Sequence, residues 1–473
     1  MEISQERYTY LDNIRNFLVY NVVLFHILCM FAYPLLWWWW AIEKNGSSRV
    51  YENLLLVMDN YLMPQLIFIA ALFIFPSLNA KSTPAYVKKR FFRLFVPVMV
   101  FAFCAGDINY QILFKRLNNS NATYFFIFLD YWRDFINFNV ITFVGKGKML
   151  NQVSFNLLHT WFLSFLFLMT LLTVLFNMPF RKKEKLPREV DSKKKIIFKT
   201  IILAMILGFF NIAVIILCLV KGIDFSSCIR VIGLVQISRI DQFFVLLPLF
   251  LFGLYTYRKD WLTRGDIGSW KMWGIISAVF IFVFALLYHN ILPVLENIFK
   301  IQEHNISFSD KILLPEIPDS FKSSILIIYI LQIPTCIFLL MFFLAFAKKF
   351  FNKPNKITEF CSKHSINVYI LHFIPVLLLQ YSLMNIPIAP IIKTMLMMII
   401  IIPACLWLSH RLVYPHPLIA ISFFVMLKLV SLFAGFDFFY IALLMVLYIS
   451  FAGAIYESVR LLVSIKRWKR GRP

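Results

Sequence analysis

The sequence predicts an all-α fold: a polytopic bundle of about 10–12 transmembrane helices with both termini in the cytoplasm. Three observations support this prediction. The chain of 473 residues is 60% apolar, with a mean hydropathy of +0.76. Long apolar runs recur to its end, and Lys and Arg concentrate in every second connection between them. Because so many spans leave no room for a sizeable soluble domain, we expect a single membrane domain.

Twelve apolar stretches are candidate spans. They lie near residues 14–34, 61–78, 93–113, 158–178, 199–220, 241–257, 272–294, 323–347, 365–383, 388–408, 417–434 and 437–457. Each is long enough to cross a hydrocarbon layer of about 30 Å as a helix. We expect residues 1–415 to form a ten-span core and residues 416–473 to add C-terminal transmembrane segments and a basic cytoplasmic tail.

The net charge of +23 follows the predicted topology. The connections 79–93, 180–199, 258–271, 348–363 and 460–473 hold 29 of the 47 Lys and Arg residues. They alternate with connections poor in Lys and Arg, and this asymmetry places both termini in the cytoplasm by the positive-inside rule. The charge therefore does not indicate a nucleic-acid partner, and we expect membrane lipid around the chain instead.

The outer connections and the cysteines are less informative. Residues 114–157 are rich in Asn and aromatic residues and are predicted to form a lid or a substrate shelf, and residues 295–322 a second outer loop. The seven cysteines fall mostly inside spans and form no CxxC pair. We expect them to pack as small apolar residues, and we expect no metal site.

Arg15 and His26 are the most informative polar residues of the first span. Their separation of eleven residues amounts to three helical turns plus about 20°, so both lie on one stripe, about 16 Å apart along the axis. Arg15 is predicted at the cytoplasmic surface, where Asp12 can pair with it, and His26 near the middle of the hydrocarbon. An imidazole at that depth is costly unless it faces the bundle interior or a water-filled cavity. His26 is a candidate general base, covalent acyl carrier or proton relay, and the remaining alternative is a packing residue.

Two pairs of residues mark the ends of other spans. Arg90 and Arg93 lie on one helical face in KKRFFRLFVP, at a predicted cytoplasmic helix start. Guanidinium groups there suit phosphates, which they bind bidentately, and contact with lipid headgroups explains them equally well. His159 and Trp161 open the fourth span, in LLHTWFLSF, at the predicted outer interface.

A polar stripe runs along the ninth span, HSINVYILHFIP. Ser365, Tyr369 and His372 follow one another at spacings of four and three residues, so they share one face of an otherwise apolar helix. We expect this face to line a cavity or to meet a polar neighbour.

Together these segments resemble the acyltransferase-3 family of integral membrane acyltransferases. Four features agree in order and spacing over roughly residues 8–385: YLDNIRNFLVYNVVLFH, KKRFFRLFVP, LLHTWFLSFLF and SINVYILHFIP. The arginine–ten–histidine signature of the family maps onto Arg15 and His26. The LDxIR opening and the absence of an extra soluble domain resemble the glucan biosynthesis protein C branch, a succinyltransferase-like group. One feature departs: family members usually carry Phe-Phe-x-x-Ser-Gly in span two, where this chain has Ala70-Ala71.

The resemblance implies transfer of an acetyl or succinyl group from cytoplasmic acyl-CoA (acetyl-CoA or succinyl-CoA) to a hydroxyl of an extracytoplasmic glycan, in a bacterial inner membrane. In that mechanism Arg90 and Arg93 would bind the CoA phosphates and Arg15 would orient the donor. His26 would act as general base or covalent acyl carrier. His159, Trp161 and the stripe 365–372 would line the acceptor side.

Two other classes of protein remain open at this stage. A proton-coupled transporter using His26 and His372 would need broken helices or internal repeats near the midplane, and the sequence shows neither. A catalytically silent membrane protein is the third reading, favoured if Ala70-Ala71 marks lost activity.

Overall fold

The computed structural model describes residues 9–33, 39–43, 46–116, 123–136, 141–144, 155–177, 190–221, 228–231, 235–237, 240–304 and 319–470. Within these residues ten helices are long and apolar enough to cross a membrane, and one bent pair of helices adds an eleventh. The prediction of an all-α transmembrane bundle is confirmed, and the chain is an integral membrane protein. The basic connection 180–199 is described only from residue 190 onward.

The helices follow the predicted spans closely. The first half holds α1 (Thr9–Leu28), α2 (Arg49–Leu72), α3 (Ile74–Asn79), α4 (Thr83–Arg90), α5 (Val96–Ala105), α6 (Ile108–Arg116), α7 (Tyr124–Ile136), α9 (Trp161–Asn177) and α10 (Lys193–Val220). The second half holds α11 (Ile240–Arg258), α12 (Trp270–His304), α13 (Asp319–Phe350), α14 (Lys356–Leu371), α15 (Phe373–Leu383), α16 (Pro390–Leu408), α17 (Pro417–Ala434) and α18 (Phe436–Arg470). The predicted span 241–257 lies in α11, whose part Gln242–Arg258 is an apolar helix shorter than the ten.

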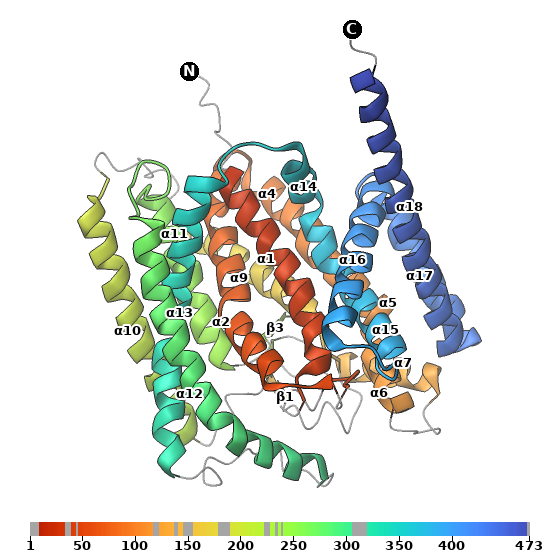
Figure 1. The fold of residues 1–473 in the computed structure, drawn as a ribbon, viewed down its shortest axis with the longest axis horizontal. Coiled ribbons are helices and arrows are strands. Elements are labelled where there is room, and N and C mark those ends of the chain that lie inside the picture. The colour runs from red at the N-terminus through yellow and green to blue at the C-terminus, as the bar shows by residue number, and fades with distance from the viewer. Residues whose placement is uncertain are drawn as a thin grey trace.

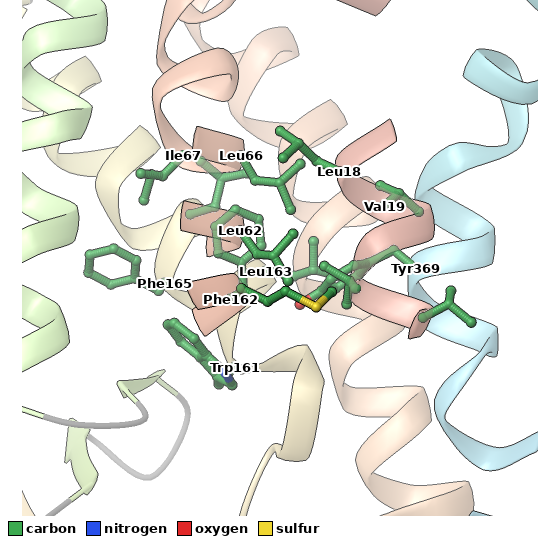
Figure 2. Packing of buried hydrophobic residues seen from close by; sticks show 14 of the residues in the cluster. Leu18, Val19, Leu62, Leu66, Ile67, Trp161, Phe162, Leu163, Phe165 and Tyr369 are labelled. Carbon is green, nitrogen blue, oxygen red and sulfur yellow. The ribbon is translucent and has the colours of Figure 1, made fainter. Parts of the chain in front are cut away.

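Helix α1 stands near the centre of the view in Figure 1 and contacts α2, α13, α14, α15 and α16. Figure 2 shows Leu18 and Val19 of α1 in the same apolar core as Leu62 of α2 and Phe162 of α9. Because α1 is covered on several sides, polar groups along it face other helices rather than lipid. This is the environment in which an intramembrane histidine is tolerated.

The two ends of the bundle carry different elements. The start of α1, the helix α4 and the end of α18 lie at one end, and the small β-sheet and α7 lie at the other (Figure 1). The basic residues of α4, Lys88, Lys89 and Arg90, thus share an end with the helices nearest to both termini. This arrangement agrees with the predicted topology, and we call these ends inner and outer.

The alanines that replace the usual serine and glycine in span two are part of a close helix contact. A Cβ added to Gly253 of α11 would lie 2.7 Å from the carbonyl oxygen of Phe68 and 2.8 Å from the Cβ of Ala71. The backbones of α2 and α11 therefore nearly touch. Small residues at this point serve helix packing, as is typical in membranes.

Proline interrupts two helices that carry candidate site residues. Pro375 lacks the N–H that would bind the Leu371 carbonyl, and α14 ends at Leu371 with a bend of 56° into α15. The expectation of unbroken helices is therefore wrong at this point. Pro97 likewise follows a π-helical turn, η3 (Phe91–Phe95), which holds Arg93.

The outer connections contain more structure than the sequence predicted. Residues 114–157 include α7 and β1 (Ile141–Val144), which pairs antiparallel with β2 (Cys228–Val231), and β2 pairs with β3 (Val235–Ile237). Ile141 faces Val231, and Ile229 faces Ile237. The prediction of a loop over 295–322 is wrong at its start, since α12 continues to His304. Residues 305–318 lie outside the described residues.

The C-terminal hairpin of α17 and α18 is attached to the outer end by a buried ion pair. The Lys428 Nζ lies 2.7 and 2.8 Å from the two carboxylate oxygens of Asp107 and donates to the Tyr124 hydroxyl at 2.6 Å. The Lys428 and Asp107 side chains are 0% and 1% exposed. Since a charge in the membrane interior requires a partner, this pair fixes α17 against the α5–α6 corner.

Candidate active site

His26 lies nearer the outer end of the bundle than the sequence predicted. Its span runs from Thr9 to Phe31, so His26 is residue 18 of 23 and stands about 9 Å beyond the middle residue. The prediction of a midplane position assumed a start near Ile14, and α1 begins five residues earlier because its first turn is already packed. His26 is half-buried. Its ring is therefore reachable from one side.

His372 is the nearest polar neighbour of His26. Its Nε2 lies 3.0 Å from the His26 Nδ1, and the ring centroids are 5.1 Å apart. His372 is the residue at the break between α14 and α15 and is 0% exposed. Its Nδ1 lies 2.8 Å from the Tyr369 carbonyl oxygen and 3.2 Å from that of Val368. At the helix break the His372 Nε2 thus faces α1, while the backbone carbonyls of the preceding turn hold its Nδ1.

His159 completes a cluster of three imidazoles that we call the histidine cluster: His26, His159 and His372. The His159 ring lies 4.9 Å from His372 and 6.1 Å from His26, centroid to centroid. It stands at the beginning of the span Leu158–Phe176 and is 5% exposed, so its side chain is buried within the bundle. Its Nε2 donates to the Ile370 carbonyl at 3.1 Å, and the Tyr369 hydroxyl donates to the His159 carbonyl at 2.5 Å.

The backbone before His159 is held in an uncommon conformation. Leu158 has a φ of 45°, in the left-handed region that a leucine rarely adopts. The Leu158 N–H donates to the Asn156 side chain at 3.1 Å, and the Leu157 N–H donates to Gln236 of β3 at 2.7 Å. The Asn156 carbonyl accepts from Tyr131 of α7 at 2.6 Å. The outer sheet and α7 therefore hold the backbone turn at residues 156–158 that directs the His159 side chain into the bundle.

Aromatic rings enclose the histidine cluster. Phe373 is stacked on His159, with 4.7 Å between centroids and 11° between planes, and Phe101 of α5 meets the same ring edge-on at 4.7 Å. Trp39 is stacked on His26 at 6.1 Å. These rings exclude water around the imidazoles, and a low dielectric strengthens the hydrogen bonds between them.

Gln380 of α15 ties Trp39 to the end of α1. Its Nε2 donates to the carbonyls of His26 at 2.8 Å and Ile27 at 3.1 Å, and the Trp39 Nε1 donates to its Oε1 at 3.1 Å. The segment that carries Trp39 is also held by the ion pair between Glu43 and Lys393. These contacts cover the histidine cluster on its outer side. The sequence analysis did not identify Gln380, although a glutamine inside the apolar run VLLLQYSL is a signal of a buried polar contact.

The predicted arginines gather at the inner end. Arg15 donates to the Ser362 carbonyl at 3.1 Å and pairs with Asp12 at 3.0 Å, as expected for that pair. Arg90 donates to the Tyr86 hydroxyl at 3.2 Å, and its guanidinium lies 5.3 Å from the centre of that ring. Arg93 is exposed and close enough to Arg15 and Arg90 to repel both electrostatically. The three form the inner arginine group, and its Arg15 lies about 16 Å from His26 along the axis of α1.

Two predicted site residues lie apart from the histidine cluster. Ser365 is buried, and its hydroxyl donates to the Ser362 carbonyl of its own helix at 3.0 Å. Trp161 is 8% exposed and packs in the apolar core at the start of α9, where it meets Phe162. Tyr369 takes part in the cluster through the His159 carbonyl, as the polar-stripe prediction allowed. Within the described residues no group of three His, Cys, Asp or Glu side chains is placed to hold a metal ion.

The comparison with protein families agrees with this arrangement. Residues 8–410 match the acyltransferase-3 family, described as an acyltransferase domain. This chain belongs to that family. No curated protein and no solved structure matches the chain. The matched residues of this membrane acyltransferase include the inner arginine group and the whole histidine cluster. The match ends before α17 begins.

Proposed function

We propose that this acyltransferase transfers an acetyl or succinyl group from acyl-CoA at the cytoplasmic face to a hydroxyl of an extracytoplasmic glycan, with His26 at the point of transfer. The observation that carries the proposal is the contact between His26 and His372 in the outer half of a bundle whose inner end holds three arginines. Family membership supplies the acyl-transfer chemistry. The choice of acyl group and the likeness to the glucan biosynthesis protein C branch belong to the proposal.

The two ends of α1 suit the two halves of this reaction. CoA carries phosphates, and guanidinium groups bind phosphates with charge-assisted, bidentate hydrogen bonds. Arg90 and Arg93 would hold those phosphates, with Arg15 beside them to orient the donor. The thioester would reach outward along α1 toward His26, about 16 Å away along the helix axis. Ser365 and Trp161 have no direct place in this path, and His159, Tyr369 and His372 would support the His26 ring on the acceptor side as buried neighbours.

The chemistry at His26 has two forms. As general base, the imidazole removes the proton of the acceptor hydroxyl, the oxygen attacks the thioester carbonyl, the C–S bond breaks and the proton passes to the thiolate. As nucleophile, the imidazole nitrogen attacks the thioester carbonyl and the C–S bond breaks to release the CoA thiolate. The acceptor oxygen then attacks the acyl carbonyl, the C–N bond breaks, and the hydroxyl proton passes to the thiolate. Both forms need a neutral ring with one free lone pair.

A proton-coupled transporter is the second candidate, because the broken helix α14–α15 at His372 is a feature of transporter sites. The family match favours transfer over transport. Labelled acetyl-CoA or succinyl-CoA taken up by proteoliposomes without formation of an acylated glycan would favour transport.

The test compares cell-surface glycans from cells that make the wild-type protein, His26→Gln or His289→Gln. His289 is an exposed histidine of α12 and serves as the control. Mass spectrometry should show acetyl or succinyl groups with wild type and with His289→Gln. His26→Gln should lower transfer by about 10²–10⁴-fold, the usual contribution of a general base. Full transfer by His26→Gln at equal protein levels would refute the proposal.

A further inference from the structure

The two ring nitrogens of His372 have different partners, and this difference assigns its proton. Nδ1 lies 2.8 Å from the Tyr369 carbonyl oxygen and 3.2 Å from the Val368 carbonyl oxygen. A carbonyl oxygen can only accept, so Nδ1 must carry the hydrogen. In a neutral imidazole the other nitrogen, Nε2, then carries a lone pair.

The same reasoning extends from His372 to His26. Since Nε2 of His372 is an acceptor, the His26 Nδ1 at 3.0 Å must be the donor. The proton of the neutral His26 ring is therefore on Nδ1, and its lone pair is on Nε2. His372 stands at the break between α14 and α15, and its Nδ1 meets two carbonyls of the last turn of α14.

We propose that His372 is a positioning residue that holds His26 in the Nδ1–H tautomer and makes the His26 Nε2 the reacting nitrogen. This inference rests on the proposed function and adds which atom reacts and what prepares it. His372 itself does not touch the acyl group, because it is fully buried and both of its nitrogens are engaged.

Burial separates His26 from the other members of the cluster. His372 is 0% and His159 5% exposed, whereas His26 is half-buried. The His159 Nε2 is occupied by the Ile370 carbonyl. Of the three rings, His26 is the one that a ligand reaches, and its Nε2 is the nitrogen that points away from His372.

The hydrogen bond to His372 grows stronger during the reaction. When the His26 Nε2 removes the proton of the acceptor hydroxyl, the ring becomes an imidazolium, and its Nδ1–H bond to a neutral acceptor becomes charge-assisted. The proton later leaves Nε2 for the CoA thiolate, and the starting tautomer returns. His372 thus stabilises the charged ring without changing its own protonation.

Two substitutions at His372 separate positioning from filling of space. Gln places a carbonyl oxygen where Nε2 stands and can still accept from the His26 Nδ1, whereas Phe fills the space and accepts nothing. We expect His372→Phe to lower kcat by about 10–100-fold with little change in the donor KM, and His372→Gln to retain most of the activity. Equal losses in both variants, or an unchanged kcat in His372→Phe, would overturn the assignment.

A spectroscopic measurement tests the tautomer independently of turnover. In ¹⁵N-histidine-labelled full-length protein, the His26 signals are identified by their loss in His26→Gln, and their shifts distinguish a protonated from an unprotonated ring nitrogen. We expect a protonated Nδ1 and an unprotonated Nε2 in wild type, and loss of this preference in His372→Phe. A protonated Nε2 in wild type would refute the inference. Absence of transfer with the expected tautomer would instead refute the proposed function.

Discussion

The histidine cluster and the inner arginine group occupy opposite ends of α1 and differ in how they are held. In the cluster, rings from three distant segments lie with their centroids 4.9–6.1 Å apart, and nitrogens of His26 and His372 are 3.0 Å apart. Phe373, Phe101 and Trp39 enclose them. In the arginine group, Arg15 and Arg90 bind residues of their own inner surface, and Arg93 is exposed beside two like charges.

The difference matches two different physical tasks. A proton or acyl transfer requires atoms fixed to a fraction of an ångström in a dry site, because misplacement reduces the rate steeply. Binding a polyanion from solution requires accessible positive charge, and mutual repulsion of arginines is relieved when an anion arrives. In the proposed function one end of α1 would therefore serve the rate of transfer and the other the affinity for the donor, and the following predictions test that division.

The largest effect on stability is expected from Lys428→Met. It leaves Asp107 buried without its partner, and breaking a buried pair in this way costs about 3–5 kcal/mol. Arg411→Gln is the control, because Arg411 pairs with Glu457 at a surface where their side chains are 51% and 27% exposed, and such a pair is worth about 0–1 kcal/mol. Thermal unfolding in detergent measures both. Similar losses in the two variants would contradict the prediction, and adding Asp107→Asn to Lys428→Met should recover part of the stability.

Gln380→Leu comes next, because it removes the acceptor of the Trp39 indole and the donor to two α1 carbonyls. We expect a loss of about 1–3 kcal/mol and a lower transfer rate, since the outer cover of the histidine cluster loosens. Gln65→Leu is a matched control on α2: Gln65 is 0% exposed, and neither of its buried amide atoms has a hydrogen-bond partner among the residues that the structure describes. That substitution should be neutral or stabilising. A greater loss in Gln65→Leu would show that these burial and hydrogen-bond assignments are wrong.

The double substitution Arg90→Gln with Arg93→Gln tests the inner end. We expect the donor KM to rise by about tenfold or more with kcat nearly unchanged, because the phosphates are remote from the reacting carbonyl. Lys353→Gln, an exposed residue of another inner connection, controls for the loss of positive charge. A fall in kcat at unchanged KM would remove the arginines from donor binding.

The smallest effect is a pH dependence at the inner surface. Asp191 accepts from Lys199 at 2.7 Å and also contacts Lys195 and Trp261, and the hydrogen bond from Lys199 contributes most to lowering the pKa of Asp191 to about 2. Because the folded pKa lies below the unfolded one, Asp191 stabilises the fold above about pH 4, and this contribution is lost as the pH falls toward 2. Thermal midpoints measured from pH 5 to pH 2.5 should converge for wild type and Asp191→Asn. A constant difference across that range would contradict the assignment.

The sequence predicted some of the site well, and the reasons differ by residue. Arg15 and His26 were found because a polar residue in an apolar helix is conspicuous and because helical periodicity fixes their common face. Tyr369 and His372 were found as a stripe for the same reason. The hydrogen-bond partner of Tyr369 could not be predicted, because its hydroxyl donates to the carbonyl of His159, which lies 210 residues away in the chain. Hydropathy places His159 at the end of its span, but it measures position along one helix and does not show that the side chain is buried in the bundle.

By itself the sequence determined the transmembrane helices and the inner position of the basic connections, and it marked one histidine and one arginine of α1 as candidate chemistry. These follow from local properties: the hydrophobicity of each segment, the charge of each loop and the period of the α-helix. Only the tertiary structure decided that His26 meets His372, which lies 346 residues away. That contact depends on how α1 and α14 are rotated about their axes and on the break at Pro375. Neither can be predicted from the periodicity of residues within a single segment.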